Sequence, residues 1–336
     1  MKEIGSDFFH FYSGNDKLDI PEKLLFCFSG RTAIDLIIKD AKIKKICLPS
    51  YCCSSMIDPF LKNGVKLSFY QVNYERELVV ELNIPDDCDA VLWCSYFGYG
   101  INYPKELYDF KMNNGIVIED ITHSLFLNQH FEKADYVFAS IRKWDAFLSG
   151  GFVWKKKGTF NVSLSKPENE FAQMRMEAMG LKNQYIKDGD QNKKNEYLEL
   201  FKESNIYFQE NYENVSMDDY SLNLIGKWNT RKIIETRINN AKILHEGIEK
   251  IEKIHTMFEK KNIVCPIFVP VIFESKELRD SISKKLIENR IYCPTHWPKP
   301  KYQNRSNVYD RELSLVCDQR YGQEDMERIL TVLREI

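Results

Sequence analysis

Four short polar segments of this sequence hold the residue types that could do chemistry, and each lies at the end of a short apolar run or at the start of the next. They are residues 29–33 (SGRTA), 119–123 (EDITH), 140–144 (SIRKW) and 150–151 (GG). Between them they offer a lysine amine, two carboxylates, an imidazole, hydroxyl groups and small residues. Segments of this kind at strand ends indicate a ligand site.

The first segment is a turn of small residues that opens a helix. Backbone N–H groups and the helix dipole at such a start favour a phosphate, which Gly30, Arg31 and Thr32 could bind. Ser29 is equally suited to cap the helix, so the pattern alone leaves both interpretations open.

The second and third segments hold the ionisable groups. Asp120 follows an apolar strand directly, where its carboxylate could face a ligand or cap the next turn. His123, taken alone, is as well explained as a packed or surface histidine. Ser140, Arg142 and Lys143 place a hydroxyl, a guanidinium and an amine in one loop, which in isolation could also be a solvated basic loop. Gly151 would let the backbone pass close to a ligand.

The spacing from Ser140 to Lys143 also matches the S-x-x-K motif of penicillin-binding serine hydrolases. Those enzymes need companion S-D-N and K-T-G elements, and neither string occurs in the sequence; the nearest is Lys157-Gly158-Thr159. The serine here follows a strand instead of opening a helix. The hydrolase interpretation is therefore disfavoured.

Apolar runs alternate with helical patterns in the first half of the chain and would position these segments. The predicted strands are residues 24–28, 46–48, 65–72, 90–94, 116–118, 136–139 and 152–154, and the predicted helices are 32–42, 56–62 and 104–112. Strands separated by helices indicate an α/β fold with a mainly parallel, seven-stranded sheet and helices on both faces. Ligands bind beyond the carboxyl ends of such strands.

The second half continues with a polar, helical segment at 161–215. Further helices are expected at 230–251, 276–289 and 323–334, with a strand at 264–273. We expect a large domain over residues 1–225 and a smaller C-terminal α/β domain over 226–336.

Charge, hydropathy and cysteine content argue against several classes of protein. A net charge of −2 over 336 residues implies no general attraction to nucleic acid or membranes, and the run of three lysines at 155–157 favours a solvated turn. No apolar run approaches the roughly 18 residues of a membrane span, and we identify no signal peptide. The nine cysteines show no zinc-ligand spacing, so we predict no metal site, reduced thiols and a cytoplasmic location.

The order of these segments resembles the DegT/DnrJ/StrS family of pyridoxal-phosphate enzymes, which are mostly sugar aminotransferases of fold type I. The similarity runs from SGRTA through LPSY (48–51), YFG (96–98), EDITH, and a lysine eight residues before Gly151, to THWP (295–298) and LSLVCDQRY (313–321). No single motif is decisive, but the ordered set is specific.

The resemblance implies a role for each residue. Lys143 would bind pyridoxal 5′-phosphate as an internal aldimine and then move a proton, and Asp120 would pair with the pyridine nitrogen. His123 would lie beside the ring. The phosphate would be held by the residues of the first and third segments, namely Gly30, Arg31, Thr32, Ser140 and, more loosely, Arg142.

The sequence departs from the family pattern in three places. Cys52 and Cys53 stand where the family has an aromatic residue that stacks on the cofactor. The lysine loop is short on its serine side. The partner subunit's usual G-Y-N-x-R-M segment is not found, and the nearest string is residues 228–231 (WNTR). These departures put the substrate and the dimer-shared part of the site in question.

The resemblance implies a homodimeric aminotransferase that transfers an amino group from a donor such as glutamate to a keto substrate. A nucleotide-linked keto-sugar for polysaccharide biosynthesis is the expected acceptor. His296 and Arg320 are candidate substrate contacts, although a packed histidine and a surface arginine explain them equally well. The alternatives are a cofactor-binding protein without turnover, or a pyridoxal-phosphate enzyme of another reaction type. Family dehydratases carry histidine in place of Lys143, and no DNA-binding segment supports a regulator.

Overall fold

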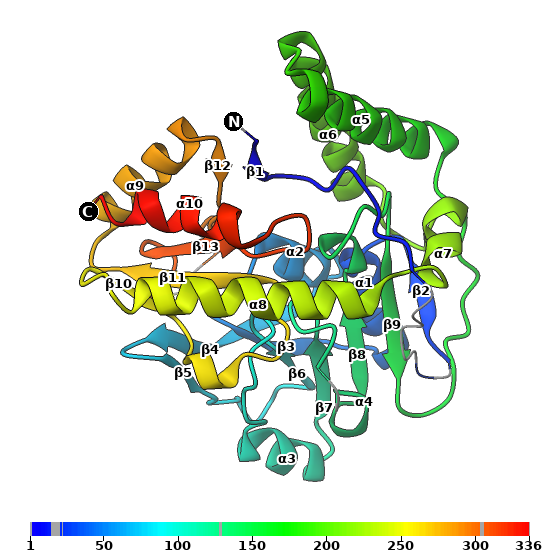
Figure 1. Ribbon diagram of the computed structural model, residues 1–336. Coiled ribbons are helices and arrows are strands. Elements are labelled where there is room, and N and C mark those ends of the chain that lie inside the picture. The colour runs from blue at the N-terminus through cyan, green and yellow to red at the C-terminus, as the bar shows by residue number, and fades with distance from the viewer. Residues whose placement is uncertain (1, 15–20, 22, 128–129, 303–305, 336) are drawn as a thin grey trace. The chain divides into compact units, whose positions relative to one another are not determined.

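A computed structural model of the chain describes residues 2–14, 21, 23–127, 130–302 and 306–335. The chain divides into two compact units (Figure 1). The first unit comprises residues 1–6, 43–135 and 231–336, and the second comprises residues 7–42 and 136–230. Each unit therefore gathers segments that are far apart in the sequence.

The first unit contains a mainly parallel run of strands. In spatial order these are β7 (Ile116–Asp120), β6 (Ala90–Cys94), β3 (Lys45–Pro49), β4 (Lys66–Tyr74) and β5 (Leu78–Glu81). Neighbouring strands pair in parallel except for β5, which pairs with β4 in the antiparallel direction. All five residues of β6 are buried, as expected for a central strand of a parallel sheet.

Helix α2 (Ser54–Lys62) connects β3 to β4, helix α3 (Lys105–Met112) connects β6 to β7, and the short α4 (His130–Lys133) follows β7. Helix α2 buries Met56, Ile57 and Phe60, which recur at helical spacing and form its apolar face. The alternation of strands and helices is the pattern that the sequence predicted.

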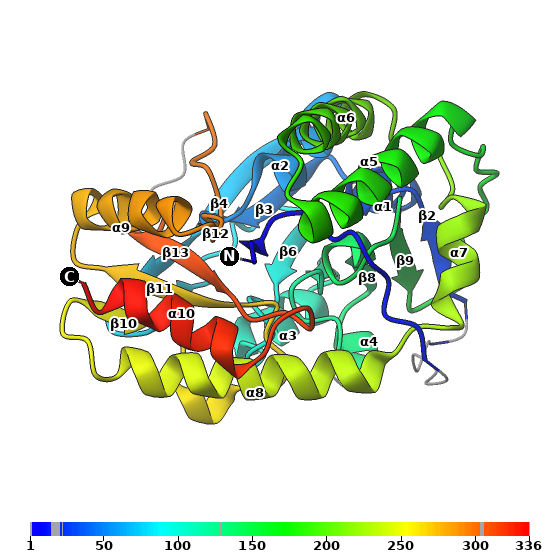
Figure 2. The same cartoon turned by 45° about the horizontal axis from the view of Figure 1, so that its top comes forward.

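The C-terminal part of the first unit has its own small sheet and hydrophobic core. Its strands lie in the order β10 (Ile254–Thr256), β11 (Phe268–Phe273) and β13 (Glu312–Val316), all antiparallel. The helices of this part are α8 (Thr230–Ile248), α9 (Lys276–Glu288) and α10 (Gln323–Leu333), and it also has a 3-10 turn, η2 (Lys260–Asn262). A short strand, β12 (Ile291–Tyr292), pairs with β1 (Ile4–Gly5). Side chains from these helices and strands share one buried cluster. Figure 2 shows the ribbons of α9 and α10 alongside β11 and β13.

The second unit has three antiparallel strands and two long helices. The strands lie in the order β2 (Leu25–Cys27), β9 (Gly151–Lys155) and β8 (Tyr136–Ala139). Its helices are α1 (Gly30–Ala41), α5 (Asn169–Asp188), α6 (Gln191–Glu210) and α7 (Asp219–Ile225), with a 3-10 turn η1 (Ile141–Lys143). Helices α5 and α6 share a core that includes Met179, Tyr197 and Phe201.

The structure confirms the α/β class and most element positions, and it corrects details. In the described part of the chain the two units contribute five and three of these strands, eight in all, where the sequence predicted seven. The additional strand is β5; β10 and β13 were also not predicted. Lys155 belongs to β9 and pairs with Asp40 at 2.7 Å, so the lysine run is not wholly a turn. The boundary at residues 225 and 226 stays a prediction.

No described helix has the length and apolar composition needed to cross a bilayer. Among the described residues, no group of three or more potential metal-ligating side chains is placed to hold a metal ion.

Gly98 generates a stability prediction. Its φ is +82°, and a Cβ atom there would lie 2.0 Å from the carbonyl oxygen of Cys265. We expect Gly98→Ala to lower the free energy of unfolding by more than about 2 kcal/mol, because left-handed strain adds to a backbone clash. Gly64 is the matched control, since its φ is +70° with nothing within 4 Å.

Gly64→Ala should cost only about 1 kcal/mol, the strain alone. Chemical denaturation of both variants measures the difference. Equal losses would contradict the role assigned to the close approach of Cys265.

Candidate functional site

Asp120 lies at the carboxyl end of β7, as the sequence predicted. Its side chain is 6% exposed, and its Oδ1 accepts a hydrogen bond of 2.8 Å from the Thr122 N–H. The preceding residue, Glu119, accepts a hydrogen bond of 2.6 Å from the Ser95 hydroxyl. Successive side chains of a strand point to opposite faces, so Asp120 and Glu119 serve opposite sides of the sheet.

His123 lies among aromatic rings of the same unit. Its ring is stacked on Trp297 at 5.4 Å between centroids, with Phe97 at 5.0 Å. The ring of His296 lies perpendicular to it at 5.2 Å. The structure thus brings together His123 and His296, two predicted site residues that are 173 positions apart (296 − 123).

The segment after β3 is buried and hydrogen-bonded to other parts of the first unit. Tyr51 is fully buried, its ring is stacked on Tyr96 at 5.6 Å, and its hydroxyl donates to the carbonyl of His296. The Tyr309 hydroxyl accepts from the Cys52 N–H at 2.9 Å. Burial raises the pKa of the Cys52 thiol well above its ordinary value, so this thiol stays protonated.

His296 is anchored by β13. Its backbone N–H donates to Glu312 at 2.6 Å, and its Nδ1 lies 2.8 Å from the Ser314 hydroxyl oxygen. Aromatic rings of Phe268 and Trp297 flank its ring. The histidine is therefore held in one orientation within a polar and aromatic surround.

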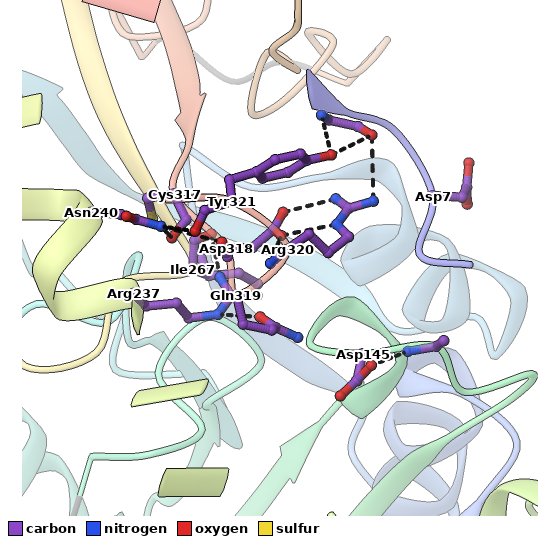
Figure 3. Close-up of polar contacts among 12 residues, drawn as sticks. Asp7, Asp145, Arg237, Asn240, Ile267, Cys317, Asp318, Gln319, Arg320 and Tyr321 are labelled. Atoms are coloured by element: carbon purple, nitrogen blue, oxygen red, sulfur yellow. Dashed lines mark hydrogen bonds and ion pairs between the residues drawn. The ribbon is translucent and has the colours of Figure 1, made fainter. Parts of the chain in front are cut away.

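Arg320 is committed to a neighbouring carboxylate. Its Nε and Nη2 donate to the two oxygens of Asp318 at 2.9 and 2.8 Å, and the exposed fraction of each side chain is 5% (Figure 3). Its Nη1 lies 3.4 Å from the carbonyl oxygen of Gly5. Arg320 is thus neither a surface arginine nor a guanidinium left open to solvent.

Two side chains of α8 hold the same segment. Arg237 donates to Gln319 at 3.0 Å and to the carbonyl of Ile267 at 2.8 Å, and Asn240 donates to the carbonyls of Cys317, Asp318 and Tyr321 (Figure 3). Nothing in the sequence indicated this role, because most of these contacts join residues about 80 positions apart and the one from Arg237 to Ile267 joins residues 30 positions apart.

In the second unit, Ser29 does cap α1. Its Oγ accepts from the Thr32 N–H at 3.3 Å and lies 3.1 Å from the Thr32 hydroxyl. Thr32 is therefore engaged by the cap. The N–H groups of Gly30 and Arg31 come earlier in α1 and have no acceptor within the helix, so they are the ones suited to a phosphate.

The lysine segment lies next to this helix start. A Cβ atom on Gly30 would come within 3.5 Å of the Ser140 Cβ, which places Ser140 beside the first turn of α1. Lys143 ends η1 and is half-buried, and its amine makes no hydrogen bond or ion pair with any residue that the structure describes. A half-buried amine of this kind is available to a ligand.

Arg142 points to an aromatic cluster. Its guanidinium lies 4.5 Å from the centre of the Phe208 ring, and Arg175 lies 5.8 Å from the same ring. Burial and the charges of Arg175 and Arg31 together lower the pKa of Arg142 to about 10, while the charge of Asp7 opposes the shift. The cation–π contact accounts for Arg142 without a phosphate. Arg175 was not singled out by the sequence analysis.

Gly151 and the string at residues 228–231 both make contacts within the second unit. The close approach at Gly151 is to the protein itself, since a Cβ there would lie 2.7 Å from the carbonyl carbon of Ser29. The WNTR string is structural: Trp228 is fully buried and donates to Asp145 at 3.0 Å.

Comparison with known proteins identifies the fold. No protein-family model matches the sequence, and no curated protein matches it. Among solved structures, Spr1654 of Streptococcus pneumoniae, described as a sugar aminotransferase in its PLP form, is 14% identical with a TM-score of 0.64, covering 94% of this chain and 86% of that one. The chain has the fold of these aminotransferases.

Two further structures agree. DesI, solved with its TDP-sugar product, is 12% identical with a TM-score of 0.62, over 93% of this chain and 80% of that one. A DegT DnrJ EryC1 StrS aminotransferase of Brucella abortus is 13% identical with a TM-score of 0.59, over 93% and 85%. The fold type expected from the sequence motifs is therefore confirmed.

The Asp318–Arg320 pair generates a prediction. Burial by itself would raise the pKa of the Asp318 carboxyl, but the charge and hydrogen bonds of Arg320 outweigh it and hold the pKa below its ordinary value. The resulting stabilisation is present above the usual pKa of about 3.9 and is lost as the pH falls through the lowered value. We expect Arg320→Met to lower the free energy of unfolding by about 3–5 kcal/mol, because it leaves a buried charge unpaired.

The double variant Asp318→Asn/Arg320→Met is the control and should be more stable than Arg320→Met alone. Chemical denaturation at neutral pH measures both. A double variant no more stable than Arg320→Met would show that the two side chains are not coupled.

Proposed function

We propose that the chain is a pyridoxal-phosphate-dependent aminotransferase. It would transfer an amino group from an amino-acid donor, with glutamate expected, to a nucleotide-linked keto-sugar. The observation that carries the proposal is the half-buried Lys143 amine, which has no hydrogen-bond or ion-pair partner among the described residues and follows β8 beside the start of α1. DesI, which shares the fold, was solved with a TDP-sugar product, and this supports the substrate class.

The residues fit the cofactor group by group. The N–H groups of Gly30 and Arg31 and the Ser140 hydroxyl suit its phosphate, and the Lys143 amine suits its aldehyde. The buried Asp120 carboxylate suits its pyridine nitrogen, and His123 would lie by the ring. Bound pyridoxal phosphate supplies an aromatic electron sink for the amino-acid carbon.

The chain's own residues would orient the cofactor and hold or move the protons. The Asp120 carboxylate would keep a proton on the ring nitrogen, and the Lys143 Nζ would move a proton to and from the reacting carbon. The Gly30 and Arg31 N–H groups would orient the cofactor through its phosphate. Arg142 would contribute only charge, because its guanidinium is engaged by Phe208.

A homodimer and a cytoplasmic location complete the proposal. The resemblance to fold type I enzymes, whose sites are built between subunits, supports the dimer. None of the nine cysteines, all of which the structure describes, forms a disulfide bond, which suits a reducing compartment. Arg320 is the weaker of the two candidate substrate contacts because Asp318 engages it, whereas His296 lies beside His123.

The first test replaces Lys143. The wild-type protein should be yellow, and borohydride should remove its visible band; Lys143→Ala should lack that band and lose roughly 10²–10⁴-fold in turnover, because the amine that moves the proton is gone. Absorbance spectra and amino-transfer assays measure both. The exposed Lys157→Ala is the control and should keep band and activity. A colourless wild-type protein would overturn the proposal, and a yellow one that no amino donor bleaches would favour binding without turnover.

The second test compares neighbours on β7. Asp120→Asn should keep the band but lower kcat/KM by about 10²–10³-fold, because a neutral amide does not hold the ring-nitrogen proton. Glu119→Gln, on the opposite face of the strand, should change kcat/KM far less. Steady-state kinetics on both variants provides the measurement, and equal losses would remove Asp120 from its proposed role.

A further inference from the structure

Glu312 is a buried carboxyl whose two oxygens are both hydrogen-bonded. Its exposed fraction is 1%. One oxygen, Oε2, accepts the backbone N–H of His296 at 2.6 Å, and the other, Oε1, lies 2.5 Å from the Ser314 hydroxyl oxygen. Glu312 and Ser314 are two residues apart on β13, so their side chains project from the same face of the strand.

Ser314 connects this carboxyl to the imidazole of His296. Its hydroxyl oxygen lies between Glu312 Oε1 and His296 Nδ1, which is 2.8 Å away. A serine hydroxyl has one proton and so donates to only one of these neighbours at a time. Whether Glu312 is protonated or ionised therefore determines whether the Ser314 hydroxyl donates a hydrogen bond to His296 Nδ1 or accepts one from it.

Two arrangements are possible. When Glu312 is ionised, the Ser314 hydroxyl donates to the carboxylate and accepts from Nδ1–H, so that Nε2 of a neutral His296 has no proton. When Glu312 is protonated, the proton lies on Oε1, because Oε2 is occupied by the His296 N–H. The carboxyl then donates to Ser314, the Ser314 proton turns to Nδ1, and Nε2 carries the imidazole proton.

We propose that Glu312 and Ser314 are positioning residues that determine which nitrogen of His296 carries its proton. The proposal rests on the proposed function for its catalytic meaning, since His296 lies against His123 at 5.2 Å and is the retained substrate-contact candidate. The Nε2 atom of His296 is then a hydrogen-bond acceptor in one state and a donor in the other.

The surroundings of Glu312 shift its pKa so that this change in protonation falls near physiological pH. Burial raises the pKa of Glu312 to about 8, while the hydrogen bonds from Ser314 and the His296 N–H and the charge of Arg279 oppose the rise. Among the residues that the structure describes, the Tyr51 hydroxyl, the Cys293 thiol and His123 are further ionisable groups beside the pair. Burial raises the pKa of Tyr51 well above its ordinary value and that of Cys293 to about 12, so neither titrates in this range.

The test is nitrogen NMR of the holoenzyme labelled with ¹⁵N-histidine, because a ring nitrogen with a proton and one without have distinct chemical shifts. The signals of His296 are assigned by their loss in His296→Gln. In the wild type we expect the proton to move from Nε2 to Nδ1 as the pH rises through about 8. The exposed His255 should show no such change at this pH.

Two variants sharpen the test. In Glu312→Gln the amide NH₂ donates to Ser314 at every pH, so His296 should keep the Nε2 proton throughout. In Ser314→Ala the relay is cut, and the change near pH 8 should disappear. A wild type without the change, or the same change in Ser314→Ala, overturns the proposal.

Kinetics tests the positioning role. The pH profile of kcat/KM should change through about pH 8 in the wild type and be flat there in Glu312→Gln. An unaltered profile in Glu312→Gln overturns the role. The NMR result does not depend on turnover, so a failed aminotransferase assay beside a clear nitrogen exchange would sink the proposed function and leave the relay intact.

Discussion

Buried loop backbone must find hydrogen-bond partners, and this constraint organises the described part of the first unit. Strand-end segments there are irregular yet enclosed, so their N–H and C=O groups cannot rely on a sheet or helix ladder. Side chains supply the partners instead. Asn240 donates to three backbone carbonyls, and Glu312 accepts from the backbone N–H of His296. The Tyr309 hydroxyl accepts from the backbone N–H of Cys52.

The same constraint explains why the proposed chemistry lies where it does. A side chain that anchors a loop also fixes the residues beside it, so His123 and His296 are held against each other by contacts that begin on β13 and β7. In the second unit the cap by Ser29 uses the N–H of Thr32 and leaves the two earlier N–H groups of α1 for an anion. The groups that satisfy the hydrogen bonds of the buried loops are thus the same as, or next to, the groups proposed to bind a ligand.

Charges in the interior follow a related rule. The Arg320 guanidinium is paired with Asp318 on both nitrogens, and Arg142 is placed on an aromatic face, so each buried cation has a defined partner. The Lys143 amine differs, because no described residue bonds to it. A bound aldehyde would explain why this half-buried amine has no partner among the described residues.

The sequence by itself determined the elements and the positions of the chemical groups. Apolar periodicity located most strands and helices, and the polar residues at their ends included Asp120, Ser140 and Lys143, because side-chain alternation and helix starts are local properties of the chain. It did not find β5, β10 or β13, since short strands with ordinary composition have no local signal of pairing.

Only the tertiary structure decided what each group contacts. Arg320 was an open candidate until the structure placed Asp318 beside it, and the close contact of Gly151 with the backbone of Ser29 could not be read from the sequence. The link from Glu312 through Ser314 to His296 joins one strand to a distant loop. Such contacts depend on how separate segments pack, and spacing along the chain does not encode the distance between two segments in space.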